Sequence, residues 1–384
     1  MESNINLKSK LPEIETNIFS KMTKMAIEHK ALNLAQGFPG FDTHKDLKKL
    51  VSKYINDGLN QYAPMPGVIE LRNEISVLVK ELYSAKYDPE SEITVVPGAT
   101  AGLYAAISST IKEGDEVIIL EPAYDSYSPV ITLNGGVPKY FKLDIGDNPV
   151  DWDSLKKLLS RKTKMIILNS PHNPTGITLS AQDMTELEKL IKNTEILVLS
   201  DEVYEHIIFD GLEHQSVARF PKLAKRSILV SSFGKTFHTT GWKMGYVLAP
   251  ANIMKEIRKV YQFMVFSSHT PTQYALAEFL KNRSYISDLS SFYQEKRDFF
   301  RAAIKGSRFK ILPCKGTYFQ ALGFTGISEM GDVEFAEWLT KEKGLACIPT
   351  SVFYKDNYDD RVLRFCFAKE EKDLKKAAQI LCKI

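Results

Sequence analysis

The chain has 384 residues, of which 44% are hydrophobic and 25% are charged, and its formal net charge is +3. These values are typical of a globular protein with more than one domain, and the small net charge argues against nucleic acid or an acidic membrane surface as a partner. The four cysteines form no C-x-x-C pair and no apolar run approaches the roughly 20 residues that span a bilayer, so we expect no disulfide framework, no metal site and no membrane segment.

The chain begins with MESNINLKSKLPEIE, which lacks the apolar region of a secretory signal. Together with the scattered cysteines, this predicts a cytoplasmic protein. The charged run HKDLKKL at 44–50 is typical of a solvated helix face. We assign residues 1–45 to an N-terminal segment that belongs with a smaller domain farther along the chain.

From about residue 93 the chain alternates short apolar runs with amphipathic segments. The apolar runs are continuous and rich in β-branched residues, which is typical of strands buried on both faces of a parallel sheet. The amphipathic segments, such as 101–111 and 184–193, have the pattern of helices. This alternation predicts an α/β fold. The predicted strands are ITVV (93–96), VIIL (117–120), MIIL (165–168), ILVL (196–199) and SILV (227–230).

Polar groups follow each predicted strand at the point where it ends. The five following stretches are PGAT, EPAYDSY, NSPHNPTG, SDEVYEH and SSFGK. In open α/β sheets the ligand lies beyond the carboxyl ends of the strands. Turn formation explains the glycines and prolines, but it does not explain Asn173, Asp201, Tyr204 and Lys235. We therefore expect a ligand site at this edge of the sheet.

Lys235 follows a glycine in the stretch SSFGKTFHTTGWKMGY. The upstream glycine of a phosphate loop is missing, because residue 229 is leucine, so a nucleotide site is excluded. Most lone lysines are solvated charges. A lysine that follows a buried strand, with Lys243 nearby, could instead lose its proton and act as a covalent catalyst.

Three further positions have both an ordinary and a functional interpretation. Asp201 directly follows an apolar strand, where it could cap a helix or pair with the ring nitrogen of pyridoxal phosphate, a cofactor that also needs a lysine. The turn PGAT opens a helix whose free N–H groups, with the Thr100 hydroxyl, could bind an anion. Arg364 lies in a predicted strand. It is either an ordinary surface residue or a bidentate partner of a carboxylate.

The second half of the chain changes character. The aromatic run YQFMVF at 261–266 is predicted to be core rather than a binding surface. From about residue 281, helical and strand patterns mix, which indicates a smaller α+β domain. We therefore divide the chain into the N-terminal segment 1–45, a large domain at 46–280 and a small domain at 281–384. The helical patterns are 292–306 and 332–344, and the strand patterns are 308–313, 316–324 and 362–368.

Taken together, these motifs resemble the class I, fold-type I aminotransferases that use pyridoxal phosphate. QYAPMPG, the five stretches above, and LRFCFAK occur in the family order, and the similarity runs from QGFPGFD at 36–42 to the C-terminal end. The chain is most similar to the branch of methionine aminotransferases and kynurenine–oxoglutarate transaminases. The resemblance implies a large α/β/α domain with a mostly parallel central sheet, a smaller α+β domain, and a homodimer with shared active sites.

The resemblance also assigns roles to individual residues. Lys235 is implied as the Schiff-base lysine and proton shuttle, and Asp201 as the partner of the pyridine nitrogen. Asn173 and Tyr204 would contact the ring hydroxyl, and Tyr124 would stack on the ring. Tyr204 therefore joins Lys235 and Asp201 as a catalytic residue.

The remaining assignments concern two anionic groups, the carboxylate of the substrate and the phosphate of the cofactor. Gly37, Asn173 and Arg364 would receive the substrate carboxylate, with Phe38 beside the substrate. Lys243 departs from the arginine of many relatives, and it keeps the charge while losing the bidentate fork. The phosphate is implied to be held by Ala99, Thr100, Ser232 and Lys243, and by Tyr62 of the neighbouring subunit.

The implied function is ping-pong transfer of the amino group from methionine or an aromatic amino acid to a 2-oxo acid. The predicted pocket segments contain aromatic residues and no arginine, which disfavours a dicarboxylate donor. Two other functions stay open at this point. One is a kynurenine or glutamine transaminase with cysteine-S-conjugate β-lyase activity. The other is a regulatory cofactor-binding protein, which the absence of a DNA-binding segment disfavours.

Overall fold

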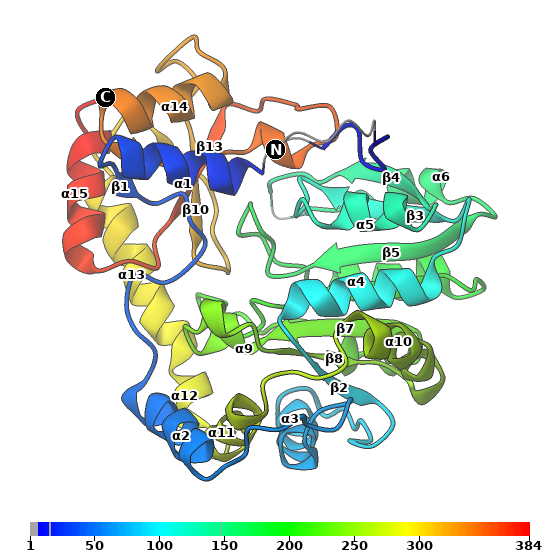
Figure 1. Cartoon of the computed structure of the whole chain (residues 1–384). Helices are drawn as coiled ribbons and strands as arrows, with labels where there is room; N and C mark the ends of the chain where they lie inside the picture. The colour runs from blue at the N-terminus through cyan, green and yellow to red at the C-terminus, as the bar shows by residue number, and fades with distance from the viewer. Residues whose placement is uncertain (1–6, 15–16, 147) are drawn as a thin grey trace.

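A seven-stranded sheet organises the larger part of the molecule (Figure 1). The computed structural model describes residues 7–14, 17–146 and 148–384. Five neighbouring strands are parallel, and β8 is antiparallel to both strands beside it. The predicted α/β fold with a mostly parallel sheet is confirmed. In sheet order the strands are β2 (Ile93–Val96), β8 (Gly245–Leu248), β7 (Ser227–Ser232), β6 (Leu197–Asp201), β5 (Thr163–Asn169), β3 (Glu116–Glu121) and β4 (Val137–Lys142).

All five strands predicted for this sheet are present, and two further strands of the sheet were not predicted. The structure adds β4, with the sequence VPKYFK, and β8, with the sequence GYVL. β4 lies at the edge of the sheet and is only partly buried, so it lacks the continuous apolar run that marks a central strand. β8 is only four residues long and begins with a glycine.

Helices cover both faces of this sheet, because alternate residues of one strand point to opposite sides. In β3, Val117 and Ile119 pack with the helices of one face, whereas Ile118 and Leu120 pack with those of the other. The first face carries α4 (Ala99–Thr110), α5 (Tyr127–Leu133) and α10 (Ala251–Met264). The second carries α2 (Lys45–Asn56), α3 (Ile69–Tyr83), α6 (Trp152–Leu158), α7 (Ala181–Ile191), α8 (Pro221–Ala224) and α11 (Thr270–Leu280).

The smaller part combines the start and the end of the chain. Its main sheet has four antiparallel strands, and β1 pairs with β11 in a separate parallel pair. Met22 and Leu34 share a buried cluster with Phe365, so the N-terminal residues pack against the C-terminal ones. The strands are β1 (Leu32–Asn33), β9 (Lys310–Ile311), β10 (Phe319–Gly323), β11 (Leu345–Ala346), β12 (Ile348–Pro349) and β13 (Val362–Cys366). The helices are α1 (Ile18–Glu28), α13 (Leu289–Ala303), α14 (Asp332–Glu342) and α15 (Glu371–Leu381), with the short α12 (Ser284–Ser287) at the junction.

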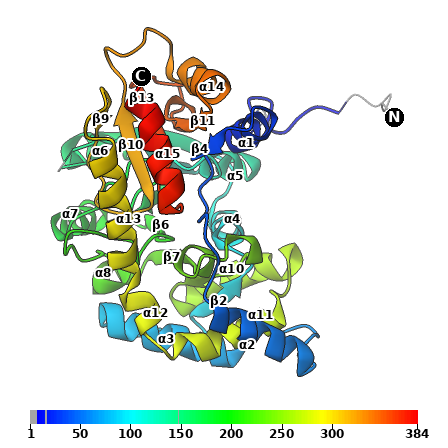
Figure 2. The same ribbon diagram turned by 90° about the vertical axis from the view of Figure 1, so that its left-hand side faces the viewer.

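The segment between β1 and α2 runs from the smaller part to the larger one, as Figure 2 shows. It carries Gly37 and Phe38, and the Gly37 carbonyl accepts a hydrogen bond from Lys235, which lies just after the carboxyl end of β7. The domain boundaries at residues 45 and 280 stay a prediction. Within the described ranges, no helix combines the length and apolarity that crossing a membrane requires.

One prediction about the surface is confirmed and another is wrong. In α2 only Leu47 is buried, as expected for the charged run at 44–50. The aromatic run at 261–266 is not core throughout. Tyr261 is fully buried, but Phe263 is 88% exposed and Phe266 is 45% exposed. Phe263 lies within α10 but two positions from Tyr261, so its side chain points to the opposite face of the helix, away from the sheet, and Phe266 lies beyond the end of α10 at Met264.

Candidate active site

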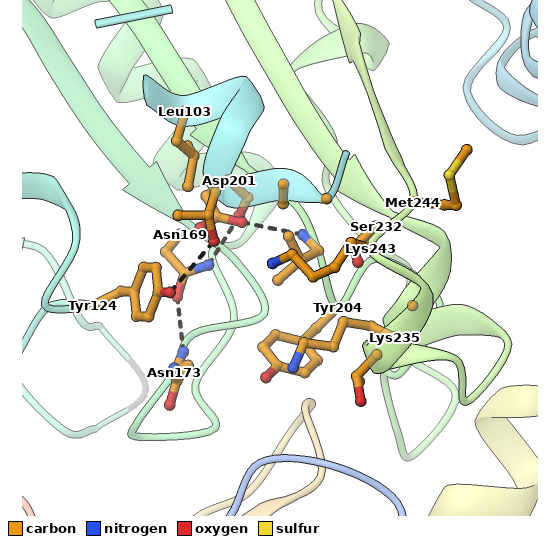
Figure 3. A pocket seen from close by; sticks show the side chains of 16 residues that line it. Leu103, Tyr124, Asn169, Asn173, Asp201, Tyr204, Ser232, Lys235, Lys243 and Met244 are labelled. Carbon is orange, nitrogen blue, oxygen red and sulfur yellow. Dashed lines mark hydrogen bonds between the residues drawn. The ribbon is translucent and has the colours of Figure 1, made fainter. Parts of the chain in front are cut away.

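A cavity of about 210 Å³ lies at the carboxyl ends of β5, β6 and β7 (Figure 3). The register of the parallel strands creates it, because Asn169 and Asp201 pair at the ends of β5 and β6. Of the residues predicted to hold a cofactor, all except Tyr62 line this cavity. The lining residues are Gly98, Ala99, Thr100, Leu103, Tyr124, Asn169, Asn173, Asp201, Val203, Tyr204, Ser232, Gly234, Lys235, Thr240, Lys243 and Met244.

Asp201 presents a buried carboxylate to this cavity, with only 4% of the residue exposed. Its Oδ2 accepts a hydrogen bond from the Tyr127 hydroxyl at 2.6 Å, and its Oδ1 accepts one from the Val203 N–H at 3.3 Å. Burial raises the pKa of Asp201 to about 6, although these bonds partly oppose the rise. The carboxylate is therefore mostly ionised at neutral pH and suits a cationic partner. Tyr127 was not predicted, although it lies in the EPAYDSY stretch.

Asn169 was also missed, and it links the ends of two neighbouring strands. Its Nδ2 donates to the Asp201 carbonyl at 2.9 Å, and its Oδ1 accepts from the Asn173 N–H at 2.8 Å. These bonds hold the loop that carries Asn173 against β6. The only signal in the sequence is that Asn169 directly follows the apolar run MIIL.

Lys235 lies in the short helix α9 (Phe233–Thr236), directly after β7. Its Nζ donates to the Tyr318 hydroxyl at 2.9 Å and to the Gly37 carbonyl at 3.1 Å. Lys235 forms no ion pair with any described residue. Burial lowers the pKa of Lys235 to about 8, and the Arg364 charge also lowers it, while Cys366 and Asp201 oppose the shift. An appreciable fraction of the amine is therefore unprotonated near neutral pH.

The N-terminus of α4 forms a positively polarised corner of the cavity. No side chain caps this helix, and the N–H groups of Ala99 and Thr100 donate to no described group. Gly98 has φ +84° and lies so close to Lys243 that an added Cβ would be 3.1 Å from its Nζ. Only glycine lets the ammonium approach the helix end this closely. With the Ser232 hydroxyl, this corner is suited to a phosphate.

Arg364, on β13, places a guanidinium beside the cavity, in addition to the Lys235 and Lys243 amines. It is 1% exposed, and its Nη1 donates to Asn173 Oδ1 at 2.7 Å and its Nη2 to the Ala35 carbonyl at 3.1 Å. Its Nε has no hydrogen-bond partner, and no described carboxylate forms an ion pair with it. Burial lowers the pKa of Arg364 to about 10, so it remains charged at neutral pH. An unpaired buried guanidinium is costly, and an anionic ligand would compensate it.

Gly37 and Phe38 do not line the cavity, but Gly37 contacts the Lys235 amine directly. The Gly37 carbonyl accepts from Lys235, and its N–H donates to no group in the described part of the chain. A Cβ at Gly37 would lie 2.9 Å from Cζ of Phe319, so a larger residue would force the loop away. The Phe38 side chain is 44% exposed, and its carbonyl accepts from Lys369 at 2.9 Å.

The family model described as "Aminotransferase class I and II" matches residues 29–381. The chain belongs to this family. The family predicted from the motifs is therefore confirmed.

Two relatives of this aminotransferase are similar over nearly their whole length. Methionine aminotransferase of Escherichia coli is 47% identical over 97% of both chains. Kynurenine–oxoglutarate transaminase of Dictyostelium discoideum is 36% identical over 96% of this chain and 94% of the relative. A crystal structure reported to have a methionine aminotransferase function, also from E. coli, matches with a TM-score of 0.97 at 46% identity, over 99% of this chain and 100% of that one.

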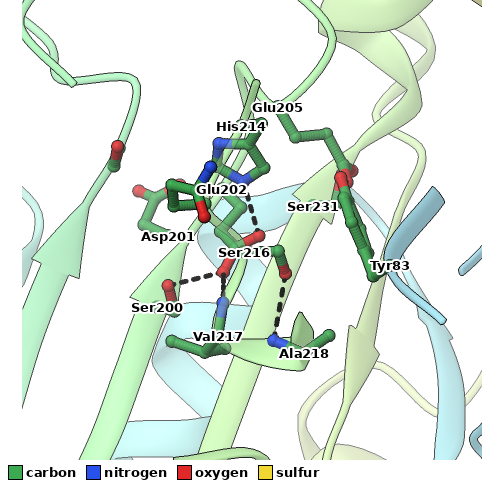
Figure 4. Close-up of polar contacts among 12 residues, drawn as sticks. Tyr83, Ser200, Asp201, Glu202, Glu205, His214, Ser216, Val217, Ala218 and Ser231 are labelled. Atoms are coloured by element: carbon green, nitrogen blue, oxygen red, sulfur yellow. Dashed lines mark hydrogen bonds and ion pairs between the residues drawn. The ribbon is translucent and has the colours of Figure 1, made fainter. Parts of the chain in front are cut away.

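Behind the cavity of this aminotransferase lies a buried polar layer that the sequence reasoning missed (Figure 4). Glu202 directly follows Asp201, and it accepts from His214 Nε2 at 2.8 Å, from the Ser200 hydroxyl at 2.8 Å and from the Val217 N–H at 3.0 Å. These bonds tie the end of β6 to the segment after it. The position of Asp201 is therefore fixed from behind as well as by Tyr127.

Glu205 is the second buried carboxylate of this layer. It accepts hydrogen bonds from the hydroxyls of Tyr83, Ser231 and Tyr246, the last at 2.9 Å. Burial alone would raise the pKa of Glu205, but His206 and the hydroxyls of Ser231 and Tyr83 keep it below its usual value. Ser231 precedes Ser232, so this network holds the end of β7. The signal in the sequence was the pair of glutamates in SDEVYEH, the stretch that follows an apolar strand.

Proposed function

We propose that this aminotransferase moves the amino group of methionine or an aromatic amino acid to a 2-oxo acid, with pyridoxal phosphate as its cofactor. One observation carries the proposal. Lys235, a buried amine with a lowered pKa, and Asp201, a buried carboxylate, line one cavity, and the unpaired Arg364 lies beside it.

The residues of the cavity fit this cofactor in charge and hydrogen-bonding type. The corner formed by Ala99, Thr100, Ser232 and Lys243 would hold the phosphate, and Lys235 would hold the cofactor covalently. Asp201 would hold a proton on the ring nitrogen through its carboxylate. Asn173 and Tyr204 would contact the ring hydroxyl, with Tyr124 against the ring. When bound, the cofactor supplies an aldehyde and a ring that draws electrons away from the substrate Cα.

The chain itself then has three tasks. Arg364 binds the substrate carboxylate and so orients the Cα–H bond toward Lys235. The Lys235 amine, unprotonated in part at neutral pH, takes this proton and later returns it. Asp201 stays ionised while the ring nitrogen keeps its proton. The first product leaves before the second substrate enters, so the kinetics are ping-pong.

An apolar donor suits the residues around Arg364. The guanidinium carbon lies 4.0 Å from the ring centre of Phe319 and 5.2 Å from that of Phe19, and Phe19 packs against Phe353 at 6.0 Å. A thioether or an aromatic ring packs favourably on such walls, whereas a second carboxylate would be desolvated there. The 47% identity to a methionine aminotransferase supports methionine over the kynurenine alternative, whose named relative is 36% identical.

The test is a comparison of kcat/KM for methionine, phenylalanine, kynurenine and aspartate with one fixed 2-oxo acid. Methionine and phenylalanine are expected to exceed aspartate by at least about a hundredfold, since an unpaired buried charge costs several kcal/mol. Aspartate equal to methionine would contradict the proposal and point to a cation such as Lys369. Release of pyruvate and a thiol from a cysteine conjugate, faster than transamination, would favour the β-lyase alternative.

We also propose a homodimer whose two active sites are shared. Tyr62 is 85% exposed and packs edge-on against Phe266 at 5.6 Å, and the strongly exposed Phe263 lies in the last turn of α10, three residues before Phe266. An exposed aromatic group of this kind is typical of an interface. Tyr62 would reach the phosphate of the neighbouring subunit.

Mixing two inactive variants tests this arrangement. Tyr62→Ala and Lys235→Ala chains, dissociated together and re-associated, are expected to recover about a quarter of the wild-type activity, because half of the dimers are hybrids with one intact site of two. Each variant treated alone is the control. Sedimentation that finds an active monomer, or a mixture that stays inactive while hybrids form, would contradict the shared site.

A further inference from the structure

Tyr318 contacts the reactive amine, although neither the family motifs nor the proposed function assigns it a role. We propose that Tyr318 is a positioning residue for proton transfer, whose hydroxyl, together with the Gly37 carbonyl, docks the free Lys235 amine and turns its lone pair toward the substrate. The inference rests on the proposed function for what the amine does, but not for how the amine is held.

The three groups form a closed set of hydrogen bonds. Lys235 Nζ donates to the Tyr318 hydroxyl oxygen at 2.9 Å and to the Gly37 carbonyl at 3.1 Å. The Tyr318 hydroxyl donates to the same Gly37 carbonyl at 2.6 Å. Each member is therefore bonded to the other two.

The direction of these bonds matters for the chemistry. Because the Tyr318 proton is donated to Gly37, the hydroxyl oxygen can only accept from Lys235. A neutral amine has two N–H bonds and one lone pair, and both N–H bonds have acceptors here. The lone pair is left on the side away from Tyr318 and Gly37. Lys235 also lines the cavity, so the free side of its amine is available to a bound substrate.

The Tyr318 hydroxyl is held in place by the protein rather than by a ligand. Tyr318 is fully buried, with its ring 5.1 Å from that of Tyr204 in an edge-on contact. The preceding residue, Thr317, donates its N–H to the Ile207 carbonyl at 2.9 Å, which ties the turn before β10 to the segment after β6. Burial raises the pKa of Tyr318 well above its ordinary value, so the hydroxyl keeps its proton.

Phe319, the next residue, fixes the second acceptor. Its ring lies where a Cβ at Gly37 would be, and Cζ would approach that Cβ to 2.9 Å. Gly37 has no side chain, and its carbonyl therefore reaches both Tyr318 and Lys235. Tyr318 and Phe319, two consecutive residues of the smaller part of the chain, thus position the Lys235 amine of the larger part, the first by a hydrogen bond and the second by packing against Gly37.

The chain offers a matched control in Tyr293. This tyrosine is also fully buried, its ring lies 5.7 Å from that of Tyr318, and its hydroxyl has no hydrogen-bond partner among the described residues. Tyr293→Phe and Tyr318→Phe remove the same atom from neighbouring buried rings. Only the second removes a contact with Lys235.

The first measurement uses the holoenzyme. Tyr318→Phe is expected to lower kcat for methionine about tenfold, the effect of one hydrogen bond to a reacting group, with KM nearly unchanged. The deuterium isotope effect with α-deuterated methionine is expected to rise, because proton transfer becomes slower relative to the other steps. Tyr293→Phe is expected to behave like the wild type. Equal losses in both variants would indicate a packing effect and overturn the proposal.

The second measurement needs no activity. In the full chain with the cofactor removed, mass spectrometry follows the labelling of Lys235 by an amine reagent as a function of pH. Loss of an acceptor destabilises the ammonium, so Tyr318→Phe is expected to shift the midpoint to lower pH, and Tyr293→Phe is not. An unshifted midpoint overturns the docking role. If no donor is transaminated, the proposed function fails, while this comparison still decides whether Tyr318 holds the amine.

Discussion

Lys235→Ala is expected to lower the rate of methionine transamination by about four orders of magnitude. The substitution removes the group that takes and returns the Cα proton, and general acid–base catalysis alone contributes up to about 10⁴-fold. Its neighbours Asp201, Ser232 and Lys243 remain in place, so the cofactor is expected to bind without a covalent link. Single-turnover absorbance measurements with methionine give the transamination rate. Dialysis against cofactor-free buffer shows how much cofactor the variant retains.

Borohydride reduction identifies the attachment site directly. In the wild type, the reduced cofactor is expected on the peptide that contains Lys235. Lys243→Gln is the matched control, because it removes a neighbouring lysine from the phosphate corner. It should weaken cofactor binding while leaving the adduct on Lys235. An adduct on another lysine in the wild type would refute the assigned role of Lys235.

Arg364→Leu is expected to lower kcat/KM for methionine by about 10²- to 10³-fold, mainly through a higher KM. Truncating one partner of a buried, hydrogen-bonded charge pair costs about 2–5 kcal/mol, and each 1.4 kcal/mol is a factor of ten. Arg364 has no carboxylate partner among the described residues, so the ion pair that the substitution removes would be the one with the substrate carboxylate. Arg364→Lys should recover part of the affinity, since it restores the charge without the fork.

A donor that lacks the carboxylate separates this role from a structural one. The wild type should strongly prefer methionine to 3-(methylthio)propylamine, the corresponding amine without a carboxylate. In Arg364→Leu this preference should collapse, because the variant has no guanidinium at that position to bind the carboxylate that distinguishes methionine from the amine. Thermal unfolding of the loaded variant controls for stability, since Arg364 also bonds to Asn173 and Ala35. An undiminished preference would show that another group binds the carboxylate.

Many of the candidate site residues could be named from the sequence because they follow buried strands. Continuous apolar runs identify central strands of a parallel sheet, and the carboxyl ends of such strands meet at one edge. Asp201 and Lys235 are therefore expected at one site from the sequence alone. The order of the motifs identified the family, and a family match over residues 29–381 agrees.

Other features were decided only by the tertiary structure. Tyr318 lies 83 positions from Lys235 and 281 from Gly37, and no local pattern shows that these three meet. The exposure of Phe263 depends on which face of α10 packs against the sheet. Asp201 and Lys235 have shifted pKa values because the folded chain excludes water from them. Local sequence sets which residues end a strand, whereas desolvation and contacts between distant segments arise only when the two parts of the chain pack together.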